Sequence, residues 1–329
     1  MIESKSQLDE AASRISQLRE EIGRVIVGQQ NVVEQLLWCL LAGGHALLEG
    51  IPGLGKTMLV RTVADCVSLQ FSRIQFTPDL MPSDITGTTL IDFSAQGAAV
   101  QRFQPGPLFG NLVLADEINR ATPKTQSALL EAMQEGTVTA GGETHVLPKP
   151  FFVLATQNPI EQEGTYPLPE AQLDRFLLKI GVDYPSREEL KQIVLRTSSV
   201  EQPKASVVMD GGSLSAIQLM AKQILLADEL LDAAVKMIMM THPGEADAPD
   251  DVKRYVRFGA GPRALQAIVG VSKVRALCAG RLHVSWNDIR ETAFPVLRHR
   301  IVLGYEAQAM GLSSDRMTEA ILQSIEAER

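Results

Sequence analysis

The sequence predicts an α/β protein in which a doubly wound parallel sheet of five strands is followed by a smaller all-helical domain. Three observations indicate this fold. A glycine-rich loop at 50–57 joins a short apolar run to a helical pattern. Five strand patterns, of which four are apolar and the one at 71–76 is alternating, occur among helical segments as far as Val182, and the period is helical almost throughout after Pro185. We expect a nucleotide-binding first domain at 1–184 and a helical second domain at 185–329.

Length and composition are those of a globular protein. The 329 residues, of which 45% are hydrophobic and 21% charged, suffice for two packed domains. The net charge of -8 disfavours mainly electrostatic binding of nucleic acid, although it does not exclude a local basic channel. Three widely spaced cysteines without a CxxC predict reduced core thiols. With no signal pattern and no apolar run of membrane-spanning length, we expect a cytoplasmic protein.

Two helices are predicted ahead of the first strand. An amphipathic stripe runs from Ser6 to Gly23, and a second helical pattern covers Asn31 to Ala42. Gly28 and Gln29 break the pattern between them. A break just ahead of a glycine-rich loop can wrap the adenine of a nucleotide, but an ordinary turn between helices is an equal alternative.

The loop Gly50-Ile51-Pro52-Gly53-Leu54-Gly55-Lys56-Thr57 has the pattern of a phosphate-binding loop. Its glycines let successive N–H groups point at phosphate oxygens, and the helix that follows adds the positive end of its dipole. We expect Lys56 to reach the β- and γ-phosphates and the Thr57 hydroxyl to ligate Mg²⁺. A chance match is disfavoured because the whole pattern lies between a strand and a helix.

Two later strands end in polar residues suited to hydrolysis. The run 112–115 leads into Asp116 and Glu117, which we expect to hold the metal through its hydration shell and to polarise the attacking water, respectively. The alternative is a strand that ends in a solvated acidic turn. The run 151–155 leads to Asn158, which is suited to hydrogen-bond the lytic water or the γ-phosphate, although Asn-Pro is also an ordinary turn.

Two hairpins interrupt the alternation of strands and helices. The first pairs 88–93 with 98–103 across a Ser-Ala-Gln-Gly turn, and the second spans 137–146 around a Gly-Gly turn. We interpret the first as a moving or partner-facing element, the alternative being a passive surface loop.

The fifth strand, 177–182, follows Leu173-Asp174-Arg175-Phe176. Because ligands of open α/β sheets lie beyond the carboxyl ends of the strands, we expect the loops with Lys56, Glu117, Asn158 and Arg175 to share one rim.

The helical second domain is predicted to begin with a capping box at Ser186-Arg187-Glu188-Glu189. Further along, the turn 258–263 opens a helix with Arg263 in its first turn. The helix dipole disfavours a cation there, so a nearby anion would explain it, and a solvated arginine is the alternative.

This ordered set of residues resembles the AAA+ ATPases. The loop 50–57 matches the Walker A motif, Asp116-Glu117 the Walker B acids, Asn158 sensor 1, Arg175 the arginine finger and Arg263 sensor 2. More narrowly, four stretches are similar to the MoxR subfamily: 49–57, 75–84, 115–121 and 155–159. The resemblance extends over nearly the whole chain from Gly28.

The resemblance implies a P-loop NTPase that hydrolyses ATP with Mg²⁺ in a homo-oligomeric ring, usually a hexamer. Arg175 would act in trans on the neighbour's γ-phosphate, and Arg120 would also face the neighbour. The implied catalytic residues are Lys56, Glu117, Asn158, Arg175 and Arg263, and the implied metal ligands are Thr57 and Asp116. The implied nucleotide contacts are Gly28, Gln29, Gly50, Pro52, Gly53, Leu54, Gly55, Lys56, Thr57, Met58 and Asp116.

At the level of biology, the resemblance implies a chaperone-like remodeller. Such proteins help to mature metalloenzymes or assemble complexes, often with a von Willebrand factor A domain partner. Two rivals remain: a nucleic-acid motor, disfavoured by the acidic composition and the lack of a recognisable nucleic-acid module, and a small-molecule kinase, which would need no arginine from a neighbour.

Overall fold

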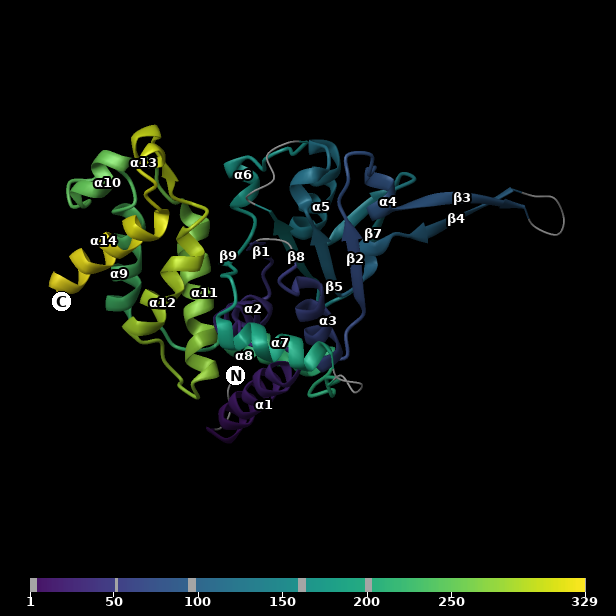
Figure 1. Cartoon of the computed structure of the whole chain (residues 1–329), viewed down its shortest axis with the longest axis horizontal. Coiled ribbons are helices and arrows are strands. Elements are labelled where there is room, and N and C mark those ends of the chain that lie inside the picture. Colours follow the sequence, from purple (N-terminus) through teal and green to yellow (C-terminus); the bar gives the residue numbers. More distant parts are fainter. Residues whose placement is uncertain (1–4, 51–52, 94–98, 159–163, 199–202, 329) are drawn as a thin grey trace.

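The computed structural model describes residues 5–50, 53–93, 99–158, 164–198 and 203–328, and a five-stranded parallel sheet lies at its centre (Figure 1). In spatial order the strands are β2 (Phe71–Gln75), β5 (Leu112–Asp116), β8 (Phe152–Gln157), β1 (Ala46–Glu49) and β9 (Leu178–Gly181). All four neighbouring pairs are parallel. The five-stranded parallel sheet predicted from the sequence is therefore confirmed.

The central strands are apolar on both faces, as a sheet covered on both sides requires. In β1, Ala46 and Leu48 belong to one buried cluster, whereas Leu47 belongs to another on the opposite face. In β5, Leu114 and Ala115 alternate in the same way. Each fully buried leucine contributes about 1.5–3 kcal/mol relative to an exposed one, so both faces hold helices firmly.

The first cluster includes residues of α1 (Lys5–Val25), α2 (Gln30–Ala42) and α3 (Lys56–Cys66), and the second includes residues of α4 (Pro82–Thr86) and α5 (Pro123–Glu135). Short 3-10 turns η1 (Pro107–Phe109) and η2 (Ile118–Arg120) follow β4 and β5. Helix α2 ends because Gly43 adopts φ 74°, a left-handed cap. The doubly wound arrangement is confirmed.

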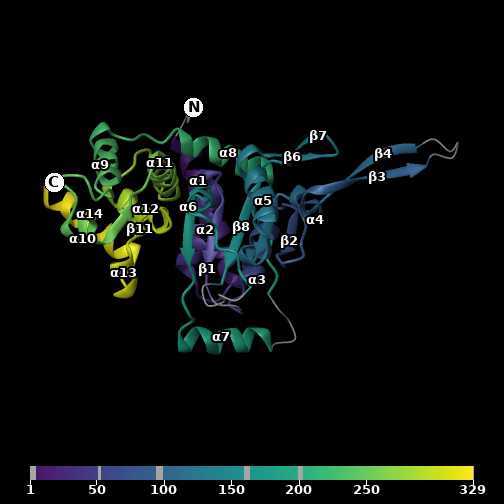
Figure 2. The same cartoon turned by 90° about the horizontal axis from the view of Figure 1, so that it is seen from above.

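Both predicted hairpins are present. The first consists of β3 (Gly87–Phe93) and β4 (Ala99–Pro105), and the second of β6 (Thr137–Ala140) and β7 (Glu143–Val146). The first hairpin projects from the sheet on the side away from the C-terminal helices (Figures 1 and 2). Its turn, 94–98, is outside the described residues.

The rings of Phe103 and His145 join the two hairpins. They stack with centroids 3.8 Å apart and planes 8° from parallel. Phe109 meets the Phe103 ring edge-on, with centroids 5.5 Å apart. The two hairpins therefore pack against each other through these rings.

The rest of the chain is mainly helical, as predicted. Its helices are α6 (Glu170–Leu173), α7 (Arg187–Thr197), α8 (Gly211–Lys222), α9 (Asp228–Met239), α10 (Asp250–Tyr255), α11 (Pro262–Cys278), α12 (Trp286–Leu297), α13 (Tyr305–Ala309) and α14 (Ser314–Glu328). A short antiparallel pair, β10 (Val256–Phe258) with β11 (Val302–Leu303), was not expected among them. The Ser186–Glu189 capping box is confirmed at the start of α7, with bonds of 2.7 and 3.3 Å.

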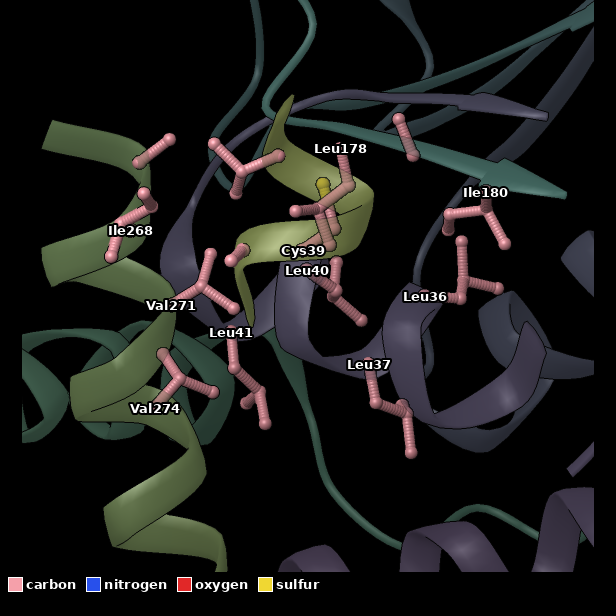
Figure 3. Packing of buried hydrophobic residues seen from close by; sticks show 14 of the residues in the cluster. Leu36, Leu37, Cys39, Leu40, Leu41, Leu178, Ile180, Ile268, Val271 and Val274 are labelled. Carbon is pink, nitrogen blue, oxygen red and sulfur yellow. The ribbon is translucent and has the colours of Figure 1, made fainter. Parts of the chain in front are cut away.

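Figure 3 shows how α11 joins the helical region to the sheet. Ile268 and Val271 of α11 pack in one buried cluster with Cys39 of α2 and Leu178 of β9. All three cysteines are free, and burial raises the pKa of the Cys66 and Cys278 thiols to about 12. The predicted boundary at 184 and 185 stays a prediction. No helix in the described ranges is both long and apolar enough to cross a membrane.

Candidate functional site

Residues predicted for phosphate chemistry gather at the carboxyl edge of the sheet. Lys56 begins α3 just after β1, Asp116 ends β5 with Glu117 directly after it, and Asn158 follows β8. These three strands are neighbours in the order β5-β8-β1, and parallel strands bring their carboxyl ends to one edge. Asn158 is buried there, with 6% of its surface exposed.

The described part of the glycine-rich loop has the backbone of a phosphate cradle. Gly53 and Gly55 have φ of 86° and 75°, which side chains disfavour, and a Cβ at either position would point into open space. Ile51 and Pro52 lie outside the described residues, so the Pro52 prediction is untouched. The ammonium of Lys56 donates to the Gly50 carbonyl.

Lys56 is half-buried, and its charge is balanced by acids. Burial lowers the pKa of Lys56 from its ordinary value of 10.5, while Asp116, Glu117 and Glu49 act to raise it. Desolvation disfavours the charged form of Lys56, and the three nearby carboxylates oppose that effect. The described part of the loop therefore presents open space at two glycines and a half-buried cation.

A buried threonine, not anticipated from the sequence, orients both acids. The hydroxyl of Thr156, which is 1% exposed, donates to Asp116 Oδ1 at 2.7 Å and accepts from the Glu117 backbone N–H at 2.8 Å. Glu117 has φ 57° and ψ 50°, a left-handed conformation that is uncommon outside glycine. The hydrogen bond from its N–H helps to hold this conformation and so the aim of its carboxylate.

Strand β2 supplies two further partners of the acids. Arg73 donates to Asp116 Oδ2 at 2.7 Å, and Gln75 donates to Glu117 Oε2 at 2.8 Å. Arg120 contacts the same Glu117 oxygen at 3.1 Å, so its guanidinium faces an acid of its own chain. The sequence contained a signal for Arg73 and Gln75, because polar residues at i and i+2 lie on the same face of a strand.

A cavity of about 560 Å³ adjoins the glycine-rich loop. It is bounded by the break at 25–29, by Leu54 and Met58, and by Tyr184 and α7. Gln29 Nε2 donates to the Leu54 carbonyl at 3.0 Å and so ties the break to the loop. Gly28 has φ 66°, and a Cβ there would lie 2.1 Å from Glu189 Oε1 of α7.

The prediction that Arg175 shares the rim of Lys56 is wrong. Arg175 precedes β9, and a residue before a parallel strand lies at the amino edge of the sheet, opposite the glycine-rich loop. Figure 2 shows β9 running from α6 towards α7. The half-buried Arg175 donates from Nη1 to the Leu130 carbonyl of α5 at 2.9 Å.

Arg263 is placed beside the same turn. Its guanidinium lies 3.7 Å from Asp174 Oδ2, so the anion near the start of α11 is a carboxylate of this chain. Two arginines predicted to act on phosphate thus lie near one turn, away from the cradle of their own chain.

Comparison with known proteins identifies the family of the chain. The profile of the ATPase family associated with various cellular activities (AAA) matches residues 45–178, and the AAA lid domain profile matches 249–325. The chain is 47% identical to Chaperone MoxR1 of Mycobacterium tuberculosis, over 93% of this chain and 80% of that protein. The chain belongs to the MoxR-type AAA+ ATPases.

Other relatives agree with this family. The MoxR-type chain is 42% identical to the uncharacterised protein YeaC of Bacillus subtilis, over 93% of this chain and 92% of YeaC. It superposes with a TM-score of 0.91 on the crystal structure of a presumed ATPase from Cytophaga hutchinsonii, at 39% identity over 98% of each chain.

The MoxR-type site fits a nucleotide and its metal. The open glycines and Lys56 suit phosphates, and the cavity has the size and apolar lining that a nucleoside requires. Among the described residues no group of three or more histidines, cysteines or acids could hold a metal ion. Thr57 and Asp116 would hold Mg²⁺, which is usually bound through one or two protein groups and substrate phosphates.

Proposed function

We propose that this MoxR-type chain hydrolyses ATP with Mg²⁺ at sites built jointly by two copies in a homo-oligomeric ring, a hexamer by resemblance. One observation carries the proposal: the cradle and the acids lie at one edge of the sheet, and Arg175 and Arg263 lie near the other. Arginines at that edge serve hydrolysis only if they meet the nucleotide of an adjoining subunit.

The residues divide the work between the two copies. In one copy, Lys56 holds the phosphates, Asp116 and Thr57 hold Mg²⁺, Glu117 polarises the attacking water and Asn158 orients it. The bound metal neutralises charge on the phosphates. The neighbouring copy supplies Arg175 and Arg263, whose positive charge stabilises the transition state.

Subunit mixing tests the shared site. Lys56→Ala is expected to abolish ATP binding in its own subunit, and Arg175→Ala to leave binding intact but remove the donated cation. Each variant alone should be inactive, whereas their mixture should recover activity at sites that pair an intact cradle with an intact arginine. Mixed assemblies without recovery would contradict the proposal.

Two controls separate the rival functions. A shared site predicts that specific activity falls on dilution, while a kinase acting alone would keep it. Stimulation of hydrolysis by DNA that disappears with added salt would favour the nucleic-acid motor. Glu117→Gln should bind ATP with near-normal affinity and hydrolyse it very slowly; normal turnover would place the base elsewhere.

We further propose that hydrolysis drives chaperone-like remodelling, with a von Willebrand factor A domain protein as partner. Support comes from the relative named Chaperone MoxR1 and from the projecting hairpin, where Ile91 is 61% exposed. A photo-crosslinking residue at Ile91 in the Glu117→Gln variant should capture a client when ATP is present. Crosslinks unaffected by ATP would count against this role.

A further inference from the structure

A buried guanidinium attaches the turn before β9 to the helical region. Arg300, whose side chain is 3% exposed, follows α12. An arginine has five N–H donors, and all five are used here. Nε donates to Asp174 Oδ1 (2.7 Å), Nη1 to the carbonyls of Leu177 (3.1 Å) and Val296 (2.7 Å), and Nη2 to those of Asp174 (3.2 Å) and Phe176 (2.7 Å).

The two residues before Arg300 reinforce this attachment. His299 Nε2 donates to the Phe176 carbonyl at 3.0 Å, and Arg298 Nη1 donates to the Lys179 carbonyl at 2.9 Å. Burial, with the Arg300 charge adding to it, lowers the pKa of His299 well below its ordinary value, so the ring is neutral. Three consecutive side chains thus hold the backbone at 174–179.

The carboxylate of Asp174 has a second cationic neighbour. Its Oδ1 accepts from Arg300, and its Oδ2 lies 3.7 Å from Arg263. Half of the Arg263 side chain is exposed, and an exposed pair of this kind contributes little to stability. The Arg300 bond is therefore the anchor, while Arg263 is held loosely enough to leave the carboxylate for a phosphate.

We propose that Asp174 and Arg300 are positioning residues that hold Arg175 and Arg263 as one unit for the nucleotide of the adjoining subunit. Asp174 is the residue directly before Arg175, so fixing its backbone and side chain fixes the start of the Arg175 side chain. The same carboxylate faces the first turn of α11, where Arg263 lies. This inference rests on the proposed function, because only a shared site gives the unit a target.

Position matters because a cation stabilises a transition state only where the charge develops. A displacement of about 1 Å can cost on the order of a hundredfold in rate. The two arginines come from the sheet region and the helical region, so without a joint their spacing would change with every movement between these regions. Asp174 and Arg300 form that joint.

The test places Asp174→Asn in one partner of a mixed assembly at a time. The reference mixture contains Lys56→Ala subunits, which donate arginines, and Arg175→Ala subunits, which bind ATP. Asparagine is close in size to aspartate but lacks the charge, so it weakens the charge-assisted bond to Arg300 Nε as well as the contact with Arg263. With Asp174→Asn in the donor, we expect kcat to fall about tenfold to a hundredfold with unchanged ATP affinity. With Asp174→Asn in the ATP-binding subunit, we expect less than a twofold change.

Asp315→Asn is the matched control. Asp315 binds Arg298 at 2.7 Å in the same joint but contacts neither Arg300 nor Arg263 in a described interaction. It should leave the mixture unchanged in either subunit. A donor-specific loss with Asp315→Asn would overturn the inference, because general loosening of the joint would then explain the result.

The other outcomes are also decisive. Equal loss with Asp174→Asn in both placements, or no loss in the donor, overturns the inference and leaves the shared site standing. A reference mixture without ATPase activity overturns both the shared site and this inference. Arg300→Lys, which keeps the charge but loses the planar fork, should reproduce the donor-specific loss of kcat; thermal unfolding of each variant will establish that it is folded.

Discussion

Removing the Thr156 hydroxyl should weaken both the fold and the acid pair. In Thr156→Val the side chain keeps its shape in a site that is 1% exposed but loses its bonds to Asp116 and to the Glu117 N–H. A hydrogen bond to a charged group contributes about 1.5–3 kcal/mol, and a neutral one about 0.5–1.5 kcal/mol. Asp116 keeps Arg73 as a partner, so we expect a loss near the lower end, about 2 kcal/mol.

Urea unfolding followed by circular dichroism measures this loss, with Thr156→Ser as the control. Serine keeps the hydroxyl and loses one methyl group, so its cost should stay near about 1 kcal/mol. We also expect Thr156→Val to lower kcat at least tenfold with little change in ATP affinity, because a carboxylate that is no longer oriented loses its aim. A valine variant as stable as wild type, or no less stable than the serine variant, would refute the reasoning.

Two further predictions concern pH and the nucleotide cavity. Burial lowers the pKa of His45 from 6.5 to about 4; its Nε2 donates to the Met133 carbonyl and its Nδ1 accepts from the Val153 N–H. The unfolded chain therefore binds one more proton between pH 6.5 and 4, and unfolding free energy should fall by about 2 kcal/mol from pH 7 to 5, less so in His45→Gln. The same fall in unfolding free energy in wild type and His45→Gln would contradict this. Gly28→Ala should cost about 1–2 kcal/mol, because a side chain is strained at the left-handed φ of 66°. It should also weaken ATP binding, because Glu189 would have to move away from the new Cβ; unchanged stability and affinity would contradict this.

Local sequence determined most of the fold and half of the candidate site. Apolar runs marked four of the five strands, because a strand buried on both faces leaves few polar positions, and an alternating run marked the edge strand β2. The loop 50–57 and the acids at 116 and 117 follow strands directly, and residues in that position reach the carboxyl edge whatever the strand order. These features depend only on neighbours along the chain.

Tertiary structure alone decided the partners. Thr156, Arg73 and Arg300 look ordinary in sequence, and their roles depend on contacts with Asp116 and Asp174 across 40 to 126 positions of chain. No local pattern encodes such contacts, since they follow from strand order and from how the helical region packs on the sheet. The sequence contained only a weak signal for Thr156, as a polar residue near the end of an apolar strand.

The position of Arg175 combines both kinds of information. Its place before the fifth strand was visible in the sequence, and strand direction alone puts such a residue at the amino edge. The proximity of Arg263 to Asp174 could not be predicted from the sequence, because 89 positions separate them and only the packing of α11 brings them together. The sequence thus determined which residues are candidates for the chemistry, and the tertiary structure decided at which edge of the sheet each one lies.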